Sequence, residues 1–214
     1  MSIAAYARTL ICSVGVTLAV GLTAPTFAQE AATSAPASPG ADALNMGVVA
    51  GTPPAPKTQE TAAIGETYLS GTFELWEQRC IKSEDGSDPC QLYQLLKDKD
   101  GNNVAEINMF PLPEGNQAAA GATIVVPLET LLTANLQLAI DGTAPRMYPF
   151  TFCAQIGCIA RVGFTGAEID QFRKGAKATM TIVPAAAPDQ HVDLDISLKG
   201  FTAGYEAVAK TVKK

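Results

Sequence analysis

The sequence is poor in the side chains on which many catalytic and nucleic-acid-binding proteins depend. It contains a single histidine, His191, and its 15 Lys and Arg residues are outnumbered by 21 Asp and Glu residues. The densest basic group, Arg173, Lys174 and Lys177, is typical of the solvated end of a helix. A nucleic-acid partner requires a basic face, and the net charge of −6 offers none. We therefore expect no nucleic-acid partner.

The sequence has little that could span a membrane. Arg8 precedes an apolar run over residues 9–22, and a small-x-small pattern ends at Ala28, as at a signal-peptidase site. The run is shorter than the roughly 20 apolar residues of a transmembrane helix, and Cys12 lies inside it rather than at its end, unlike the cysteine of a lipoprotein. We predict a cleaved signal peptide over residues 1–28 and a mature chain without a transmembrane segment.

Signal removal leaves four cysteines, Cys80, Cys90, Cys153 and Cys158. An even number of cysteines in an exported chain indicates disulfides, because that compartment is oxidising. Three pairings are possible, and short loop closure favours Cys80–Cys90 and Cys153–Cys158. Structural zinc is disfavoured because nine residues separate the first two cysteines, and no C-x-x-C redox motif is present. We expect no metal and no cofactor.

Residues 29–64 are rich in Ala, Pro, Gly, Ser and Thr and contain no aromatic residue. Such a segment buries too little apolar surface to offset its ordering entropy, so we predict a disordered Ala/Pro-rich linker. From about Gly65 the composition changes, and aromatic and large apolar residues recur. Residues 65–214 are expected to form the folded domain. The expected strands are Thr67–Ile81, Cys90–Leu96, Val104–Phe110, Gly121–Pro127, Asn135–Ile140, Lys177–Val183 and His191–Leu198.

Two helices are expected among these strands. Thr165-Gly-Ala-Glu168 is a capping box, which predicts a helix from Thr165 to Lys174 ended by Gly175. A second helix is predicted at 202–212. Because strands and helices do not alternate, the pattern predicts an all-β, antiparallel β-sandwich with one short internal helix, a C-terminal helix and two local disulfides.

The stretch from Phe150 to Arg161 is typical of a tight hairpin whose strand ends are cross-linked by Cys153 and Cys158. We interpret it first as a structural staple. Its exposed tip is also a candidate binding loop. The tip comprises Ala154, Gln155, Ile156 and Gly157.

The turn Asp98-Lys-Asp100-Gly-Asn102 begins like a calcium-binding loop. The sixth position, which requires glycine, is Asn103, and the twelfth, which requires a bidentate glutamate, is Met109. The pattern therefore favours an ordinary hairpin turn.

His191, the one candidate general base for hydrolysis, lies near Asp193 and Asp195 in the sequence. Strand alternation places these three on one solvated face, and the sequence contains no G-x-S-x-G nucleophile elbow. We expect no catalytic residues.

Several residues together resemble the invasion-associated locus B family, exported proteins of Gram-negative bacteria. The resemblance covers roughly residues 70–208, and its most specific element is the paired W-x-x-R-C…C and C-x-x-x-G-C-x-A arrangement. The loop around 116–120 and the linker depart from the family. The residues that carry the resemblance are Phe73-Glu-Leu-Trp76, Arg79-Cys80, Cys90-Gln-Leu, Phe152-Cys153, Gly157-Cys158-Ile-Ala and Ile196-Ser-Leu-Lys-Gly-Phe201.

The resemblance implies an immunoglobulin-like β-sandwich in the periplasm, with outer-membrane association or secretion left open, and no known catalytic residues. In some members it implies a role in entry into host cells. We therefore expect a non-enzymatic envelope protein that binds an envelope or host-surface protein through loops or a sheet edge. The alternatives are a metal-dependent or hydrolytic envelope enzyme, centred on Asp98, Asp100 and Asn102 or on His191, and a periplasmic chaperone or assembly factor. The oligomeric state is left open.

Overall fold

The computed structural model describes residues 55–212. The expected signal peptide and residues 29–54 of the expected linker lie outside the described part of the chain. The last ten residues of that linker are described, and they contact the domain: the backbone N–H of Leu69 donates to the Lys57 carbonyl (2.9 Å), and the Lys57 ammonium pairs with Glu66 (2.6 Å). Ala62 is buried in the core.

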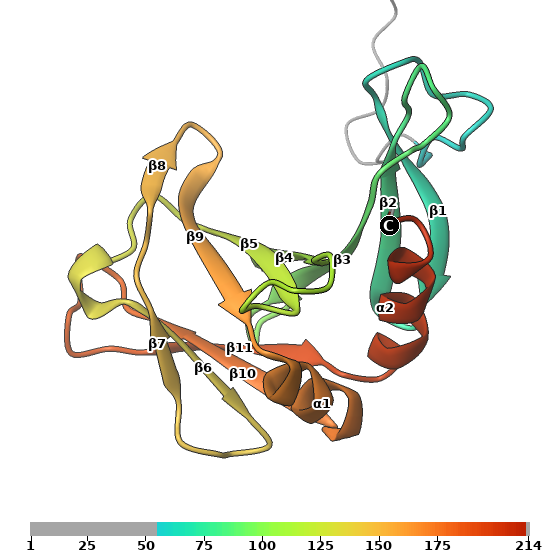
Figure 1. Ribbon diagram of the computed structural model, residues 1–214. Helices are drawn as coiled ribbons and strands as arrows, with labels where there is room; N and C mark the ends of the chain where they lie inside the picture. The colour runs from blue at the N-terminus through green and yellow to red at the C-terminus, as the bar shows by residue number, and fades with distance from the viewer. Residues whose placement is uncertain (1–54, 213–214) are drawn as a thin grey trace, which may run out of the picture. The chain divides into compact units, whose positions relative to one another are not determined.

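The larger of two sheets has seven antiparallel strands in the order β1-β2-β3-β4-β5-β9-β8. Figure 1 shows the β1–β2 and β8–β9 hairpins at its opposite ends. Alternate residues of the Asn103–Pro111 strand are apolar and buried on one face, as the two-residue period of a half-buried strand requires, whereas its neighbour Ala120–Val126 is buried along nearly its whole length. The strands are β1 (Thr67–Phe73), β2 (Trp76–Ile81), β3 (Cys90–Lys97), β4 (Asn103–Pro111), β5 (Ala120–Val126), β8 (Phe152–Ala154) and β9 (Gly157–Phe164).

The second sheet has four antiparallel strands in the order β11-β10-β6-β7. A short 3-10 helix, Leu132–Ala134, precedes it. Its strands are β6 (Leu136–Ile140), β7 (Arg146–Tyr148), β10 (Lys177–Ile182) and β11 (Val192–Ser197).

Two helices accompany the sheets. In α1 (Gly166–Lys174), the Thr165 hydroxyl accepts from the Glu168 backbone N–H and the Glu168 carboxylate accepts from the Thr165 N–H, so the predicted capping box is present. The second helix, α2 (Phe201–Ala209), follows Gly200 at φ 79°, a conformation that favours glycine. A Cβ at Gly200 would lie 2.4 Å from a β1 carbonyl oxygen.

A cluster of buried aromatic rings joins the helices to the sheets. Phe201 of α2 packs edge-on against Trp76 of β2 (5.5 Å between centroids) and contacts Phe172 of α1 (5.3 Å). Phe172 in turn meets Phe164 of β9 at 5.1 Å. Burial of each such ring contributes about 1.5–3 kcal/mol, so this cluster fixes where both helices lie on the sheets.

A polar link between the sheets lies within this core. The buried Gln94 side chain of β3 donates from Nε2 to the Ser197 carbonyl (3.0 Å) and accepts the Ser197 N–H at Oε1 (2.8 Å). The Trp76 indole N–H donates to the same carbonyl at 2.7 Å. The edge of β11 is therefore hydrogen-bonded to the larger sheet through side chains.

The predicted antiparallel β-sandwich with an internal helix, a terminal helix and two local disulfides is confirmed. The prediction of one strand over Thr67–Ile81 is wrong, because a two-residue turn divides it into β1 and β2. Glu74 adopts φ 57° in this turn, and Leu75 is 66% exposed. β1 is accordingly an edge strand and is not enclosed within the sandwich. Strand β7 was not predicted, and the terminal helix ends at Ala209 rather than at residue 212.

Candidate functional site

The hairpin at the β8 end of the large sheet is built as the sequence predicted. Cys153 of β8 lies directly opposite Cys158 of β9, and the two form a disulfide. Ala154 pairs with Gly157, which leaves Gln155 and Ile156 as a two-residue turn. The cross-link and the short turn together hold the turn residues in one position relative to the sheet.

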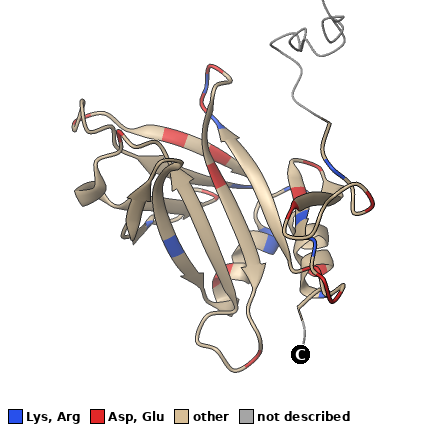
Figure 2. Cartoon of the chain, turned by 90° about the horizontal axis from the view of Figure 1, so that it is seen from above, with Lys and Arg blue, Asp and Glu red and all other residues tan. Residues whose placement is uncertain are grey.

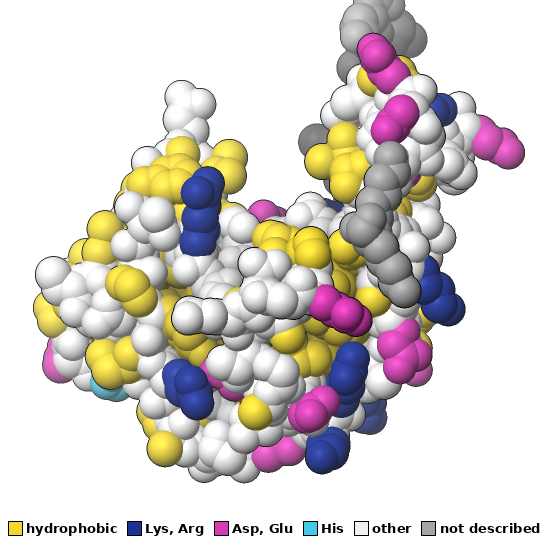
Figure 3. Space-filling view, viewed as in Figure 1, with side chains coloured by type: hydrophobic (Ala, Val, Ile, Leu, Met, Phe, Trp, Pro, Cys, Tyr) yellow, Lys and Arg dark blue, Asp and Glu magenta, His cyan; other side chains and the backbone are white. Residues whose placement is uncertain are grey.

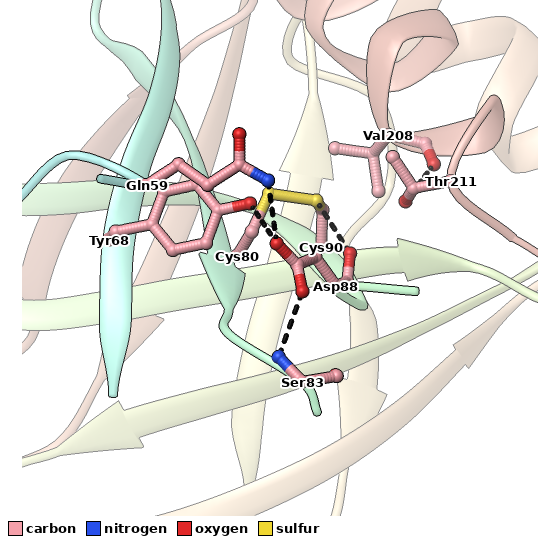
Figure 4. Close-up of a disulfide and its surroundings, with 8 residues drawn as sticks. All are labelled: Gln59, Tyr68, Cys80, Ser83, Asp88, Cys90, Val208 and Thr211. Carbon is pink, nitrogen blue, oxygen red and sulfur yellow. Dashed lines mark hydrogen bonds between the residues drawn. A yellow bond between two sulfur atoms is a disulfide. The ribbon is translucent and has the colours of Figure 1, made fainter. Parts of the chain in front are cut away.

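The second predicted disulfide, Cys80–Cys90, joins β2 and β3, also at directly opposed positions. Unlike the exposed Cys153, both of its cysteines are buried. Figure 4 shows Asp88 beside it, with three groups directed at its carboxylate. These are the Tyr68 hydroxyl (2.7 Å), the Ser83 N–H (2.8 Å) and the Gln59 amide (3.0 Å).

These bonds set the ionisation of the Asp88 site. The Ser83 N–H, followed by the Tyr68 hydroxyl, holds the pKa of Asp88 below its usual value. Burial, followed by the hydrogen bond to Asp88, raises the pKa of Tyr68 to about 12. Since the donors come from three segments of chain, the carboxylate organises the β2–β3 connection, and we assign it to structure.

Gly157 explains how the hairpin meets the sheet. Its φ is +139°, which favours glycine, and a Cβ there would lie 2.3 Å from the Val126 carbonyl oxygen. The start of β9 is thus pressed against the end of β5. Of the four predicted tip residues, Ala154, Gln155 and Ile156 are exposed, whereas Gly157 is buried.

The surface around the tip is apolar and has few charges. Ile156 is 73% exposed, Phe152 43% and Leu128, just beyond β5, 58%. Residues 127–163 contain only four charged side chains. One of them, Arg161, lies 5.5 Å above the Phe152 ring in a cation–π contact. Figure 3 shows hydrophobic side chains gathered where β8 and β9 rise from the body of the molecule.

A groove of about 350 Å³ begins at this tip and continues over the ends of three strands. Ile156 forms one wall, and the other lining residues include Leu95 of β3, Glu106 of β4 and Val125 of β5. Sequence reasoning named the tip but missed the groove, since its strands come from separate parts of the chain. Apolar residues at outward positions of β3 and β5 were the available signal.

A second hollow, of about 490 Å³, lies at the other hairpin end. Ile81, Pro89, Phe110 and Val212 are among its lining residues, and none of the lining residues is charged. It adjoins the Cys80–Cys90 disulfide, near the Thr211 side chain drawn in Figure 4.

The Asp98 turn satisfies its own polar groups. Asp98 Oδ1 accepts the backbone N–H groups of Asp100 and Asn102, both at 2.9 Å, and Oδ2 accepts from the Asn102 amide. Within residues 55–212, no three His, Cys, Asp or Glu side chains are placed to share a metal ion. The predicted hairpin turn between β3 and β4 is confirmed.

The residues weighed for hydrolysis lie on a solvated strand face. His191, Asp193 and Asp195 are exposed, while the alternate Leu194 and Ile196 are buried. Asp195 pairs with Lys177 of β10 at 3.0 Å. The predicted alternation of β11 is therefore confirmed.

Charged residues are dispersed over the described strands and loops, as Figure 2 shows, without a basic cluster on the face in view. In the described region, neither helix has the length and apolar character required to cross a membrane.

Comparison with known proteins gives the chain a family. A model of the invasion associated locus B (IalB) protein family matches residues 76–209. Invasion protein B homologues from two Brucella abortus strains are each 25% identical over 149 residues, which is 70% of this chain and 84% of theirs. The crystal structure of invasion associated protein B from Bartonella henselae shares the fold, with a TM-score of 0.56 at 19% identity over 66% of this chain and 96% of that chain. The chain therefore belongs to the invasion associated locus B family.

Proposed function

We propose that the protein is an exported, non-enzymatic component of the cell envelope that binds another protein through the β8–β9 hairpin tip. The observation that carries the proposal is the Ile156 side chain, which is 73% exposed on a turn fixed by a disulfide. An apolar side chain held in one position loses little entropy on binding, so preorganisation favours such a tip as a contact.

The disulfides support an exported location. Disulfides of this kind persist in oxidising compartments such as the periplasm and the extracellular space, and the predicted signal peptide would deliver the chain there. The Brucella relatives carry the name invasion protein B homologue. We extend to this chain a surface-binding role of that type, with an envelope or host-surface protein as the partner.

A binding role accounts for the side chains better than catalysis does. The oxygens of Asp98 already accept hydrogen bonds within their own turn, and His191 stands on an exposed strand face. The Ile156 side chain, by contrast, is exposed and takes no part in the hydrophobic core of the domain.

The test is chemical crosslinking of the mature protein in intact envelope, followed by purification and identification of the crosslinked partner. Ile156→Asp should abolish capture of a partner that the wild-type protein captures. Leu75→Asp is a matched control, because Leu75 is 66% exposed on the two-residue turn of the opposite hairpin. Equal capture by the wild type and by Ile156→Asp, with both proteins folded, would refute the proposed site.

A further inference from the structure

We infer that the groove beside the hairpin tip binds a polypeptide segment that presents an aliphatic side chain next to a lysine or arginine. The inference rests on the proposed function and specifies the partner chemistry of the same site. The lining residues and their charges carry it.

A cross-strand row on the outer face of the large sheet forms the floor of the groove. Leu95 of β3 pairs with Glu106 of β4, which pairs with Val125 of β5, and Val125 pairs with Ile159 of β9. Directly paired residues project from the same face with their Cβ atoms about 4.5–5.5 Å apart. Apolar side chains thus flank a single carboxylate, and Ile156 borders the groove at the hairpin end.

The volume of the groove is suited to one side chain of a bound polypeptide together with the residues next to it. Small-ligand pockets start at about 300 Å³, and this groove provides about 350 Å³ in an open form. An open apolar groove beside a sheet favours a polypeptide segment, in which one anchoring side chain contributes most of the affinity.

The charge of the groove selects the neighbour of that anchor. Glu106 is the only charged residue among those that line it. The nearby Arg79 is already engaged, since it pairs with Glu77 at 2.7 Å and stacks 3.2 Å above the Tyr93 ring. Lys97, farther along β3, is not among the lining residues. Glu106 accepts a hydrogen bond from the Tyr93 hydroxyl, which is a neutral donor. The negative charge of this carboxylate favours a partner that brings a cation to it.

The inference is tested by methyl NMR titration of the mature protein with short synthetic peptides. The probe peptide has one leucine flanked by lysines, and the matched peptides replace the lysines by glutamates or the leucine by serine. We expect the lysine–leucine peptide alone to shift the methyl signals of Leu95, Val125 and Ile156. Equal shifts with the glutamate–leucine peptide, or shifts confined to other methyl groups, would overturn the inference.

Variants separate charge from apolar contact. Ile156→Asp should weaken peptide binding by more than about tenfold, and Glu106→Gln by about threefold, which is the scale of a partly exposed ion pair. Glu106→Lys should reverse the preference between lysine and glutamate peptides. Glu114→Lys, in the exposed β4–β5 loop, makes the same charge change away from the groove and should leave binding unchanged. Near-ultraviolet circular dichroism establishes that each variant is folded.

The same variants distinguish this inference from the proposed function. If Ile156→Asp abolishes partner capture in the envelope while Glu106→Lys leaves it unchanged, the hairpin binds but the basic partner is wrong. If Ile156→Asp has no effect on capture, the binding site itself is wrong. Flotation with phosphatidylcholine vesicles that depends on Ile156 and is insensitive to Glu106 would overturn the polypeptide partner in favour of a lipid surface.

Discussion

Replacement of Gln94 by leucine tests whether the two sheets are held together by more than apolar burial. Gln94 is 2% exposed and lies on the core face of β3. Its amide occupies the free edge of β11: the Leu198 N–H donates to the Ala176 carbonyl, so the alternate residue, Ser197, points its backbone groups away from β10. The side chain thereby satisfies a strand edge that would otherwise be buried without partners.

The magnitude follows from the groups left behind. Leucine fills most of the glutamine volume but accepts no hydrogen bond, so the Ser197 N–H loses its 2.8 Å partner. The Ser197 carbonyl keeps the Trp76 indole N–H at 2.7 Å. An unsatisfied buried donor costs about 1–3 kcal/mol, and we expect Gln94→Leu to lower the free energy of unfolding by about 2 kcal/mol. In a domain of this size the melting temperature should fall by about 4–8 °C.

The measurement is urea unfolding with the disulfides intact, followed by tryptophan fluorescence and circular dichroism. Gln91→Leu is the control, because Gln91 lies on the same strand with its side chain on the opposite, partly exposed face, and it should change stability by less than about 0.5 kcal/mol. Trp76→Phe combined with Gln94→Leu, followed by circular dichroism alone, should cost more than the sum of the single changes, since the Ser197 carbonyl then loses both donors. If Gln94→Leu is as stable as the wild type, the polar link does not stabilise the sandwich.

Three further predictions concern the hairpins. Removal of the Cys153–Cys158 disulfide by Cys153→Ala and Cys158→Ala should lower the melting temperature only slightly, because the bond closes a loop with a sequence separation of only five, yet it should weaken partner capture. Since Cys153 is exposed and both Cys80 and Cys90 are buried, a mild reductant should open the Cys153–Cys158 bond first, as thiol alkylation and mass mapping would show. The reverse order would contradict the argument from exposure. Gly157→Ala should destabilise the hairpin, because the added Cβ would collide with a carbonyl oxygen of β5. Hydrogen exchange of the amides at the hairpin tip should therefore be faster in this variant than in the wild type. Folding lowers the pKa of Asp88. The ionised Asp88 carboxylate therefore stabilises the fold above its unfolded pKa of about 3.9, and this stabilisation is lost as the pH falls through the folded pKa. The melting temperature of the wild type should drop more steeply below about pH 4 than that of Asp88→Asn.

Much of the fold could be predicted because its signals are local. The capping box at Thr165 and Glu168 fixes one helix start, and two cysteine pairs at short spacing mark two hairpins. The failure at Thr67–Ile81 has a physical reason: Glu74 adopts a left-handed conformation without glycine, asparagine or proline to indicate a turn. Alternation continues through such a turn, so the sequence resembles one long strand.

The site was only half predictable for a related reason. The tip is a contiguous segment, whereas the groove combines Leu95, Glu106 and Val125 through strand pairings that no local pattern specifies. Gln94 was also missed, although its position between Leu92 and Leu96 on the core face is a readable signal. A polar residue at an inward strand position requires a buried partner, and the structure supplies that partner from a strand about a hundred residues later.

Each disulfide joins directly opposed residues of two adjacent strands, but the two bonds differ in how far their surroundings are buried. Cys80 and Cys90 are both buried, and the adjoining Asp88 carboxylate accepts hydrogen bonds from three segments of the chain. Around Cys153 the chain is turned outward, and the turn that the bond closes exposes Ile156 at the mouth of a groove. The exposed Ile156 side chain contributes little to folding stability, because its apolar surface stays in contact with water. Under the proposed function, the β8–β9 hairpin is a rigid support for a contact surface, and its disulfide fixes the geometry of that surface.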